Sequence, residues 1–541
     1  MIKKIVTTVV LSVLFLSCYS KVPVISSIDP KIGNMGDIIT IRGRNFGAER
    51  EGAYVSIAGV MPTNSSYYTW QDDLILLRIP ESGQSGLVYV HVKGRKSNGV
   101  LFSNYTAVPR PVEGEDFGME PKIVSVNPQA GAPGTLVTIT GNNFGASRED
   151  SGVFFSWDYE ALSINPYVVT EPEFIEVSET EIGYEAWNAH EIRVRLPDGA
   201  VSGNFKIKTH NGESRPAFFD VTGKPGYKNF KDKRSYTISY SVDVKITEAS
   251  RPNTLYLWIP MPVTSAVQRN VKLVSRSTNP FVENYRGVSL YKLDNISAGS
   301  THTINLSFNV EVFAVETGIK PALIKQGKST LNTVYTQSTN LIPADNSHIK
   351  KTVENIIGKE QNPYIKARLL YDWLIKNIDF IETPLNTAGA VSALGQKKAD
   401  SCSAILLYTA MARAVKVPCI PTAGVLINSH SQTMRHYWAE IWIDDFGWLA
   451  VDPVLGAGAV PDSYVNKEET DLVNYYFGNI DSQRIAFSRG ELNLSQMGSK
   501  GRLVSNTQSY SLQNIWEEAS GGLVSYSSLW GDIIIRGTYA Q

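Results

Sequence analysis

The chain has 541 residues, enough for roughly three to five domains. Its 51 basic and 52 acidic side chains give a net charge of -1, and the basic residues form no patch, which argues against a nucleic-acid-binding protein. A hydrophobic content of 43%, with many Tyr, Gly, Ser and Thr residues, is typical of soluble β domains.

The N-terminal residues have the pattern of an export signal. Two lysines precede an apolar run over 5–16 that is too short to span a bilayer well. The run ends in Phe-Leu-Ser before Cys18, which resembles the lipobox of bacterial lipoproteins. We therefore expect residues 1–17 to be a lipoprotein signal peptide and Cys18 to carry a lipid. Residues 18–22 would tether the protein to the bacterial cell envelope, facing the periplasm or the surface. The alternative is an ordinary secretory peptide in which Cys18 is incidental.

Only two further cysteines exist, Cys402 and Cys419. A disulfide between them would join the start of a helix to the loop after the same helix, points some 20 Å apart at about 1.5 Å per residue. We expect both thiols to be free. An exported protein with so few cysteines is not held together by disulfides, so a retained thiol invites a chemical role.

Two segments of the chain repeat each other. Residues 27–48 and 125–146 are offset by 98 positions, and 11 of the 22 aligned residues are identical, which indicates two similar domains in tandem. Each copy has a Pro/Gly turn, an alternating strand and a Gly-Xaa-Asn-Phe-Gly turn. The pattern resembles the IPT/TIG family of immunoglobulin-like domains, which implies β-sandwiches over 23–107 and 121–222. The resemblance also implies spacers or binding modules, with a protein or a carbohydrate as candidate ligand.

Residues 230–315 again alternate with period two and predict a third β-sandwich. The run Leu-Tyr-Leu-Trp-Ile-Pro-Met-Pro within it resembles the β domain that precedes the catalytic core in bacterial transglutaminase-like proteins.

Helical periodicity begins near residue 346 and predicts a compact α+β unit over 345–456. Asn362 and Pro363 form an N-cap and N1 pair. The helix after them should bury a stripe that begins at Ile365 and continues through Leu369, Trp373 and Ile378, with Leu370 and Leu374 widening it. A helix over 403–415 and strands over 422–428, 436–443 and 448–452 should follow.

Three side chains in this unit suit nucleophilic catalysis. Cys402 stands at the start of a predicted helix, and His436 and Asp452 stand on adjacent predicted strands. The surrounding runs resemble the transglutaminase-like (transglut_core) superfamily, a papain-like fold, in order and spacing. The resemblance implies that Cys402 is the nucleophile, His436 the general base and Asp452 the orienting carboxylate. One departure is that the family usually has Gly-Asp directly before the Cys, whereas Ala399-Asp400-Ser401 stands here.

The hairpin register can be predicted from the apolar pattern. A three-residue loop pairs Ile443 with Gly447 and joins the apolar residues of both strands into one face. The same register places Asp452 opposite Trp438 and diagonal to His436. A two-residue loop would split both sets.

The expected chemistry is attack of a Cys402 thiolate on an amide carbonyl, with an acyl-enzyme intermediate. We expect the helix dipole and His436 to lower the pKa of Cys402. The oxyanion should meet the Cys402 backbone N–H and one side-chain donor, with Trp373, Tyr371 and Gln396 as candidates. We predict no metal site and no cofactor.

Several neighbouring residues have a simpler interpretation. Cys419 is expected to be a packing residue, His430 a loop residue and Asp400 a helix cap. The three tryptophans of the hairpin, Trp438, Trp442 and Trp448, should pack beneath the site.

The C-terminal extension, residues 457–541, is harder to interpret. The segment 475–490 resembles one that follows the core in some bacterial relatives. Asn479, Gln483 and Arg484 are candidates to line the cleft, and the alternative is a solvated loop. The stretch with Trp516 and Trp530 is a candidate for further strands.

The sequence thus predicts a multidomain protein with two Ig-like β-sandwiches, a third β-sandwich and an α+β transglutaminase-like core. Its function is expected to be that of a lipid-anchored cysteine hydrolase or acyltransferase, with peptides or protein amides as substrates and hydrolysis favoured over cross-linking. The alternative is a non-catalytic adhesion or scaffold lipoprotein that uses the same folds for binding.

Overall fold

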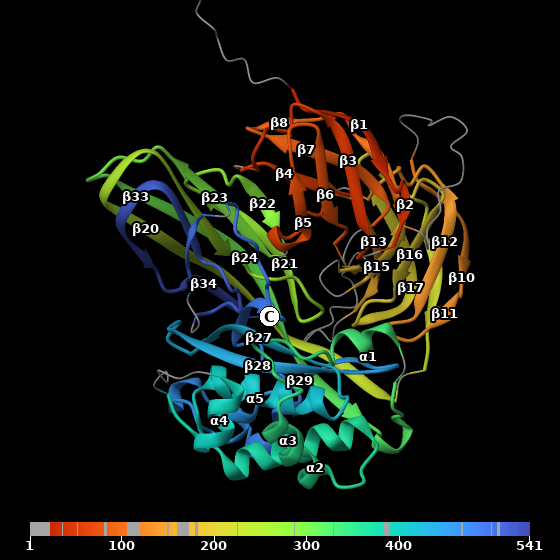
Figure 1. The fold of residues 1–541 in the computed structure, drawn as a ribbon. Coiled ribbons are helices and arrows are strands. Elements are labelled where there is room, and N and C mark those ends of the chain that lie inside the picture. Colours follow the sequence, from red (N-terminus) through yellow and green to blue (C-terminus); the bar gives the residue numbers. More distant parts are fainter. Residues whose placement is uncertain are drawn as a thin grey trace, which may run out of the picture.

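The computed structural model describes residues 22–540, except residues 35, 51, 81–83, 105–119, 149–150, 159–172, 179–181, 224, 286, 328, 383–388, 467–468, 499 and 506–508. The predicted signal peptide and Cys18 lie outside the described residues. In the part of the chain that is described, no helix has the length and apolar character needed to cross a membrane. Figure 1 shows two β domains in red and orange, a third in green with blue C-terminal strands, and a helical core below them.

The first repeat copy is a sandwich of two sheets, with strand orders β1-β3-β6-β5 and β2-β9-β7-β4 and with β8 on β7. The alternation predicted for its central strand is present, since Ile39 and Ile41 are fully buried. Its elements are β1 (Val24–Asp29), β2 (Ile32–Gly33), β3 (Ile38–Arg44), β4 (Tyr54–Ile57), η1 (Asn64–Ser66), β5 (Tyr67–Trp70), β6 (Leu74–Arg78), β7 (Gly86–Val92), β8 (Arg95–Lys96) and β9 (Val100–Asn104).

The second copy repeats this plan with sheets β10-β12-β16-β15 and β11-β19-β17-β13-β14, and with β18 on β17. Its elements are β10 (Lys122–Asn127), β11 (Ala130–Gly131), β12 (Leu136–Asn142), β13 (Gly152–Trp157), β14 (Glu173–Glu176), β15 (Tyr184–Trp187), β16 (Glu191–Arg195), β17 (Ala200–Thr209), β18 (Gly212–Glu213) and β19 (Ala217–Val221).

One repeated glycine has a steric reason in both copies. A Cβ added at Gly43 or Gly141 would lie 2.0 Å from the carbonyl oxygen of Val24 or Lys122 on the paired strand. The backbones approach too closely there for any side chain.

The third β domain is built from two distant parts of the chain. Its eight-stranded sheet has the path β21-β24-β20-β23-β22, and the C-terminal strands β33 and β34 pair with β20. The C-terminal stretch with Trp516 and Trp530 therefore completes this domain, as the blue strands among green ones show in Figure 1. Its strands are β20 (Gly226–Pro260), β21 (Gln268–Arg276), β22 (Val282–Tyr285), β23 (Val288–Asp294), β24 (Thr301–Ile319), β32 (Arg502–Val504), β33 (Glu517–Trp530) and β34 (Ile534–Ala540).

The core places helices on a five-stranded sheet of order β30-β29-β28-β27-β31. The sheet consists of β27 (Cys419–Ile427), β28 (Thr433–Ile443), β29 (Gly447–Val451), β30 (Phe477–Gly478) and β31 (Arg484–Arg489). The other elements are η3 (Pro321–Leu323), α1 (Thr330–Val334), α2 (Ser347–Ile357), α3 (Pro363–Asn377), β25 (Asp379–Phe380), α4 (Ala390–Gln396), β26 (Lys398–Ala399), α5 (Ser401–Ala414), α6 (Pro453–Gly456), η4 (Asp462–Tyr464) and α7 (Leu472–Tyr475).

Helix α3 starts as predicted, with Asn362 as N-cap and Pro363 at its first position, and it buries part of the predicted stripe. Leu370, Leu374 and Ile378 are buried as predicted, whereas Ile365, Leu369 and Trp373 are only partly buried. The helix packs against α5 and α6, and this packing shifts the centre of its buried face away from the predicted one. The residues it buries are Pro363, Lys366, Ala367, Leu370, Tyr371 and Leu374.

The second repeat copy packs directly against the rest of the molecule. The Trp157 ring lies 5.2 Å from the Phe230 ring and 4.9 Å from the Phe313 ring, centroid to centroid, and Arg269 stacks on the same indole at 3.9 Å. Trp157 and Trp438 belong to one continuous buried cluster. This copy is therefore built into the body of the protein.

Candidate active site

The hairpin of β28 and β29 has the predicted register. Ile443 pairs with Gly447 and Ala439 with Val451, so Asp452 follows directly where the sequence places it. His436, Trp438 and Glu440 share one face of β28, because successive side chains of a strand alternate between its two faces.

This register brings His436 and Asp452 together. Their side chains are 1% and 4% exposed, and Nε2 of the imidazole lies 2.8 Å from Oδ2 of the carboxylate. An ionised carboxylate only accepts hydrogen bonds, so the Nε2–H donates and Nδ1 is left to take a proton. Asp452 also caps α6, since its Oδ1 accepts from the Leu455 N–H at 3.1 Å.

Arg484 extends this pair into a buried network. Its Nη1 lies 3.2 Å from Asp452 Oδ2, and its Nη2 lies 2.6 Å from Asp481 Oδ2. The Tyr476 hydroxyl donates to the same Asp481 oxygen at 3.1 Å. The guanidinium also lies 5.0 Å from the centre of the Trp438 ring. Arg484 belongs to a buried sheet strand, so the solvated-loop alternative for this part of 475–490 is wrong.

The network keeps both carboxylates ionised. Burial alone would raise the pKa of Asp452, but the charges of His436 and Arg484 and the hydrogen bonds from His436 and Leu455 outweigh it and lower that pKa. Burial is likewise outweighed at Asp481, where Arg484 lowers the pKa. Asp481 and Tyr476 were not predicted from the sequence, and the short spacing of Asp481 to Arg484 is the only signal that points to them.

The first turn of α5 holds the predicted nucleophile. Asp400 caps this helix as expected, with Oδ1 accepting from the Ser403 N–H at 2.7 Å. Cys402 is 3% exposed, and its thiol hydrogen-bonds the hydroxyl of Tyr437. That hydroxyl also donates to the Ser509 carbonyl.

The surroundings of Cys402 contradict the expected lowering of its pKa. Burial and the neighbouring Asp400 carboxylate raise the pKa of the thiol to about 12, against a small opposing effect of Tyr437. Desolvation disfavours the thiolate, and the charge that caps the helix has the wrong sign to help it. Burial of the thiol and the Asp400 carboxylate thus outweigh the helix dipole, which was expected to lower the pKa of Cys402.

The three oxyanion candidates lie in different places. Tyr371 is fully buried near Asp452, and its hydroxyl donates to the Val473 carbonyl at 2.9 Å. Trp373 is partly buried, with the Lys397 ammonium 4.3 Å from its ring centre. Gln396 is exposed at the end of α4 and donates to Ser392 at 3.1 Å. Trp438, predicted to pack, has a buried Nε1 without a hydrogen-bond partner among the described residues.

Other predicted roles can be compared with the structure directly. Neither Cys402 nor Cys419 forms a disulfide, Cys419 is fully buried, and His430 lies exposed in a turn. Trp442 and Trp448 pack edge to face at 5.3 Å between ring centres. Asn479 accepts from the Thr317 N–H at 2.8 Å through its side chain. Within the described ranges, no group of three or more His, Cys, Asp or Glu side chains is placed to hold a metal ion.

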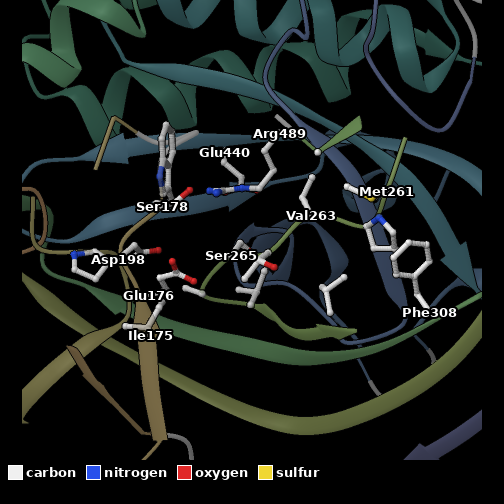
Figure 2. Close-up of a pocket in the computed structure, with 18 of the residues that line it drawn as sticks. Ile175, Glu176, Ser178, Asp198, Met261, Val263, Ser265, Phe308, Glu440 and Arg489 are labelled. Carbon is white, nitrogen blue, oxygen red and sulfur yellow. The ribbon is translucent and has the colours of Figure 1, made fainter. Parts of the chain in front are cut away.

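A cavity of about 540 Å³ lies between the second repeat copy, the third β domain and the core sheet. Figure 2 shows Glu440 and Arg489 entering it from the core, Glu176 and Asp198 from the repeat copy, and Phe308 from the third domain. Glu440 and Arg489 form a buried ion pair at 2.5 Å. The cavity is on the same face of β28 as His436, which does not line it.

Comparison with known proteins identifies the parts of the chain. Residues 23–107 and 121–221 match the IPT/TIG domain model, and residues 350–453 match the model of the transglutaminase-like superfamily. The chain therefore contains two IPT/TIG domains and a transglutaminase-like domain, as predicted.

Matches that cover about half of this chain are distant. An uncharacterized protein of Haemophilus influenzae is 23% identical over an alignment of 306 residues, and the match covers 49% of this chain and 82% of that one. A structure described as a "putative cysteine protease" from Cytophaga hutchinsonii is 12% identical, covers 58% of this chain and 93% of its own, and has a TM-score of 0.38. The periplasmic domain of TgpA from Pseudomonas aeruginosa is 13% identical, with coverages of 45% and 92% and a TM-score of 0.25.

Proposed function

We propose that the transglutaminase-like domain is an amide hydrolase or acyltransferase that works through a covalent acyl-enzyme on peptide or protein amides. The observation that carries this proposal is the buried His436–Asp452 hydrogen bond of 2.8 Å, formed between a residue of β28 and the residue that follows β29. A buried carboxylate that orients an imidazole through a hydrogen bond is the arrangement that general-base activation of a nucleophile needs.

The reaction follows from these positions. His436 Nδ1 accepts the proton of a nucleophile on the first turn of α5, where the sequence predicts Cys402. The nucleophile attacks the amide carbonyl, and His436 passes the proton to the leaving amine. Asp452 stabilises the imidazolium that forms in between, and Arg484 holds Asp452 in its charged state. Water or a second amine then releases the acyl group.

The test is turnover by the full-length protein. A library of peptides is incubated with the protein and with His436→Ala, and new termini and incorporation of a dansylated primary amine are followed by mass spectrometry. We expect products that the wild-type protein makes and His436→Ala does not. Equal product profiles from the two proteins would contradict the proposal.

A second candidate function is binding without catalysis. The burial of Cys402, His436 and Asp452 and the separate cavity of about 540 Å³ favour it. Under this alternative a peptide or glycan binds in the cavity and its affinity is unchanged in His436→Ala but lost in a variant that fills the cavity, such as Val263→Trp.

Membrane attachment through Cys18 is part of the proposal. The lipobox-like run before Cys18 supports it. Cells fed labelled palmitate should label the wild-type protein and not Cys18→Ala, and label in both would contradict the assignment.

A further inference from the structure

The first turn of α5 carries three side chains with a hydroxyl or thiol: Ser401, Cys402 and Ser403. Successive residues of a helix point about 100° apart, so these three cannot face the same surroundings. Their exposure and partners differ, and these differences decide which of them can meet a substrate.

The thiol of Cys402 points into the helical core. It hydrogen-bonds Tyr437 and belongs to the buried cluster that also contains Ala439 and Ile441. Tyr437, Ala439 and Ile441 form one face of β28. His436 is adjacent to Tyr437 in this strand, so its side chain leaves the backbone toward the opposite face. The contact with Tyr437 therefore directs the thiol away from the imidazole.

Ser403 is committed to the interior as well. It is fully buried, and its hydroxyl accepts the N–H of Gly389 at 3.2 Å. Ser401 is the one of the three that is only partly buried. Among these three side chains, Ser401 is therefore the one that a substrate can reach.

The direction of α5 places Ser401 at the end of the helix that lies nearest the backbone of His436 along β28. At the C-terminal end of the helix, Arg413 donates to the carbonyl of Cys419, which pairs with Ile441. At the N-terminal end, Cys402 lies against Tyr437. The helix thus follows β28 backwards from Ile441 to Tyr437, and its next residue toward the N-terminus continues in the direction of His436.

We infer that Ser401 is the nucleophile of the proposed reaction and that Cys402 is a core residue. This inference rests on the proposed function and names the group that forms the acyl-enzyme. The sequence agrees with this inference. The transglutaminase-like family usually has Asp directly before the nucleophile, and in this chain Ser401, and not Cys402, directly follows Asp400.

The step balances with groups of this chain and a substrate amide. His436 Nδ1 takes the proton of the Ser401 hydroxyl while Oγ bonds to the carbonyl carbon. The C–N bond then breaks, and the imidazolium gives its proton to the amine that leaves. Water repeats the sequence on the ester, which returns the Ser401 hydroxyl and releases a carboxylic acid.

The experiment compares Ser401→Ala with Cys402→Ala in the full-length protein. Turnover of the peptide library is one readout, and covalent labelling by a fluorophosphonate, mapped by mass spectrometry, is the other. We expect Ser401→Ala to lose roughly 10³-fold or more in rate, and Cys402→Ala less than about threefold. The label should sit on Ser401 and vanish in His436→Ala.

A third readout needs neither substrate nor turnover. The thiol introduced by Ser401→Cys in a Cys402→Ala background should react with iodoacetamide at pH 7 at least about 10-fold faster than Cys402 of the wild-type protein. This advantage should disappear when His436→Ala is added, and its persistence there would contradict contact with the imidazole.

The outcomes separate the inference from the proposed function. Turnover that depends on His436 but is lost in Cys402→Ala and kept in Ser401→Ala would overturn the inference and leave the proposed function intact. If no turnover depends on His436, the proposed function fails. The role of Ser401 is then tested by fluorophosphonate labelling and by the iodoacetamide reactivity of Ser401→Cys. If Ser401 is not labelled and the introduced thiol is not activated by His436, the inference is overturned.

Discussion

The two faces of strand β28 have opposite characters. One face carries Tyr437, Ala439, Ile441 and Ile443 and packs on α5 as part of a dry helical core. The other carries His436, Trp438 and Glu440, and its charged groups are paired with Asp452, Arg484 and Arg489. The Cys402 thiol can therefore contact β28 without contacting His436, because adjacent residues of a strand point to opposite faces of the sheet.

The largest expected effect is on the polar face. Asp452→Asn keeps the shape of the side chain but can donate to Nε2, which would leave the proton of His436 on the wrong nitrogen. We expect the turnover rate to fall by roughly 10³- to 10⁴-fold with little change in KM. Steady-state kinetics on a peptide cleaved by the wild-type protein measures this, and a rate within tenfold of wild type would argue against the assigned tautomer.

The second expected effect is on folding. Arg484→Met leaves Asp452 and Asp481 buried without their cation, which should lower the free energy of unfolding by about 3–5 kcal/mol. Arg435→Met is the matched control, because Arg435 and its partner Asp532 are 44% and 79% exposed and 3.4 Å apart. We expect less than about 1 kcal/mol there. Equal urea midpoints for the two variants would contradict the buried network.

A third effect is expected on the pH dependence of stability, through Asp452 and Asp481 on the polar face of β28. The pKa values of Asp452 and Asp481 are lowered in the folded protein, so their contribution to stability is present above the unfolded value of about 3.9. It is lost as the pH falls through the lower folded values. Urea unfolding between pH 5 and pH 3 should therefore show a shallower loss of stability in Asp481→Asn than in wild type. Asp532→Asn is the exposed control, and a slope for Asp481→Asn as steep as the wild type would contradict this prediction.

The smallest expected effect is on the core face. Cys402→Ala removes one buried sulfur and its hydrogen bond to Tyr437, and we expect a loss of about 1 kcal/mol in the free energy of unfolding. Tyr437→Phe should cost a similar amount, because the Ser509 carbonyl also loses its donor. Thermal unfolding of both variants measures this, and a loss above about 3 kcal/mol would indicate a larger role for this contact.

Local patterns in the sequence were sufficient for much of the fold. The repeated turn motif identified the two IPT/TIG domains, and the apolar pattern of the hairpin gave the register that joins His436 to Asp452. Capping chemistry correctly placed Asp400 and Asn362. In each case neighbours in the sequence supply the interaction.

The failures involve partners that are distant in the chain. The C-terminal strands complete a sheet begun at β20, more than 200 residues earlier, and no local signal reports that pairing. The pKa of Cys402 depends on burial beneath Tyr437 and Ser509, which a helix-dipole argument does not include. The choice of buried stripe on α3 likewise depends on the helices that pack against it.

The central claim is that Cys402 and His436 lie on opposite faces of β28. The most direct test is the pH dependence of Cys402 alkylation, measured in Cys419→Ser with and without His436→Ala. Burial and Asp400 raise the pKa of this thiol to about 12, so labelling should be slow at pH 7, should rise with pH well above 8.5, and should be the same in both proteins. Rapid labelling well below pH 8.5 that His436→Ala abolishes would show a thiolate paired with the imidazole, and would contradict the separation of Cys402 from His436.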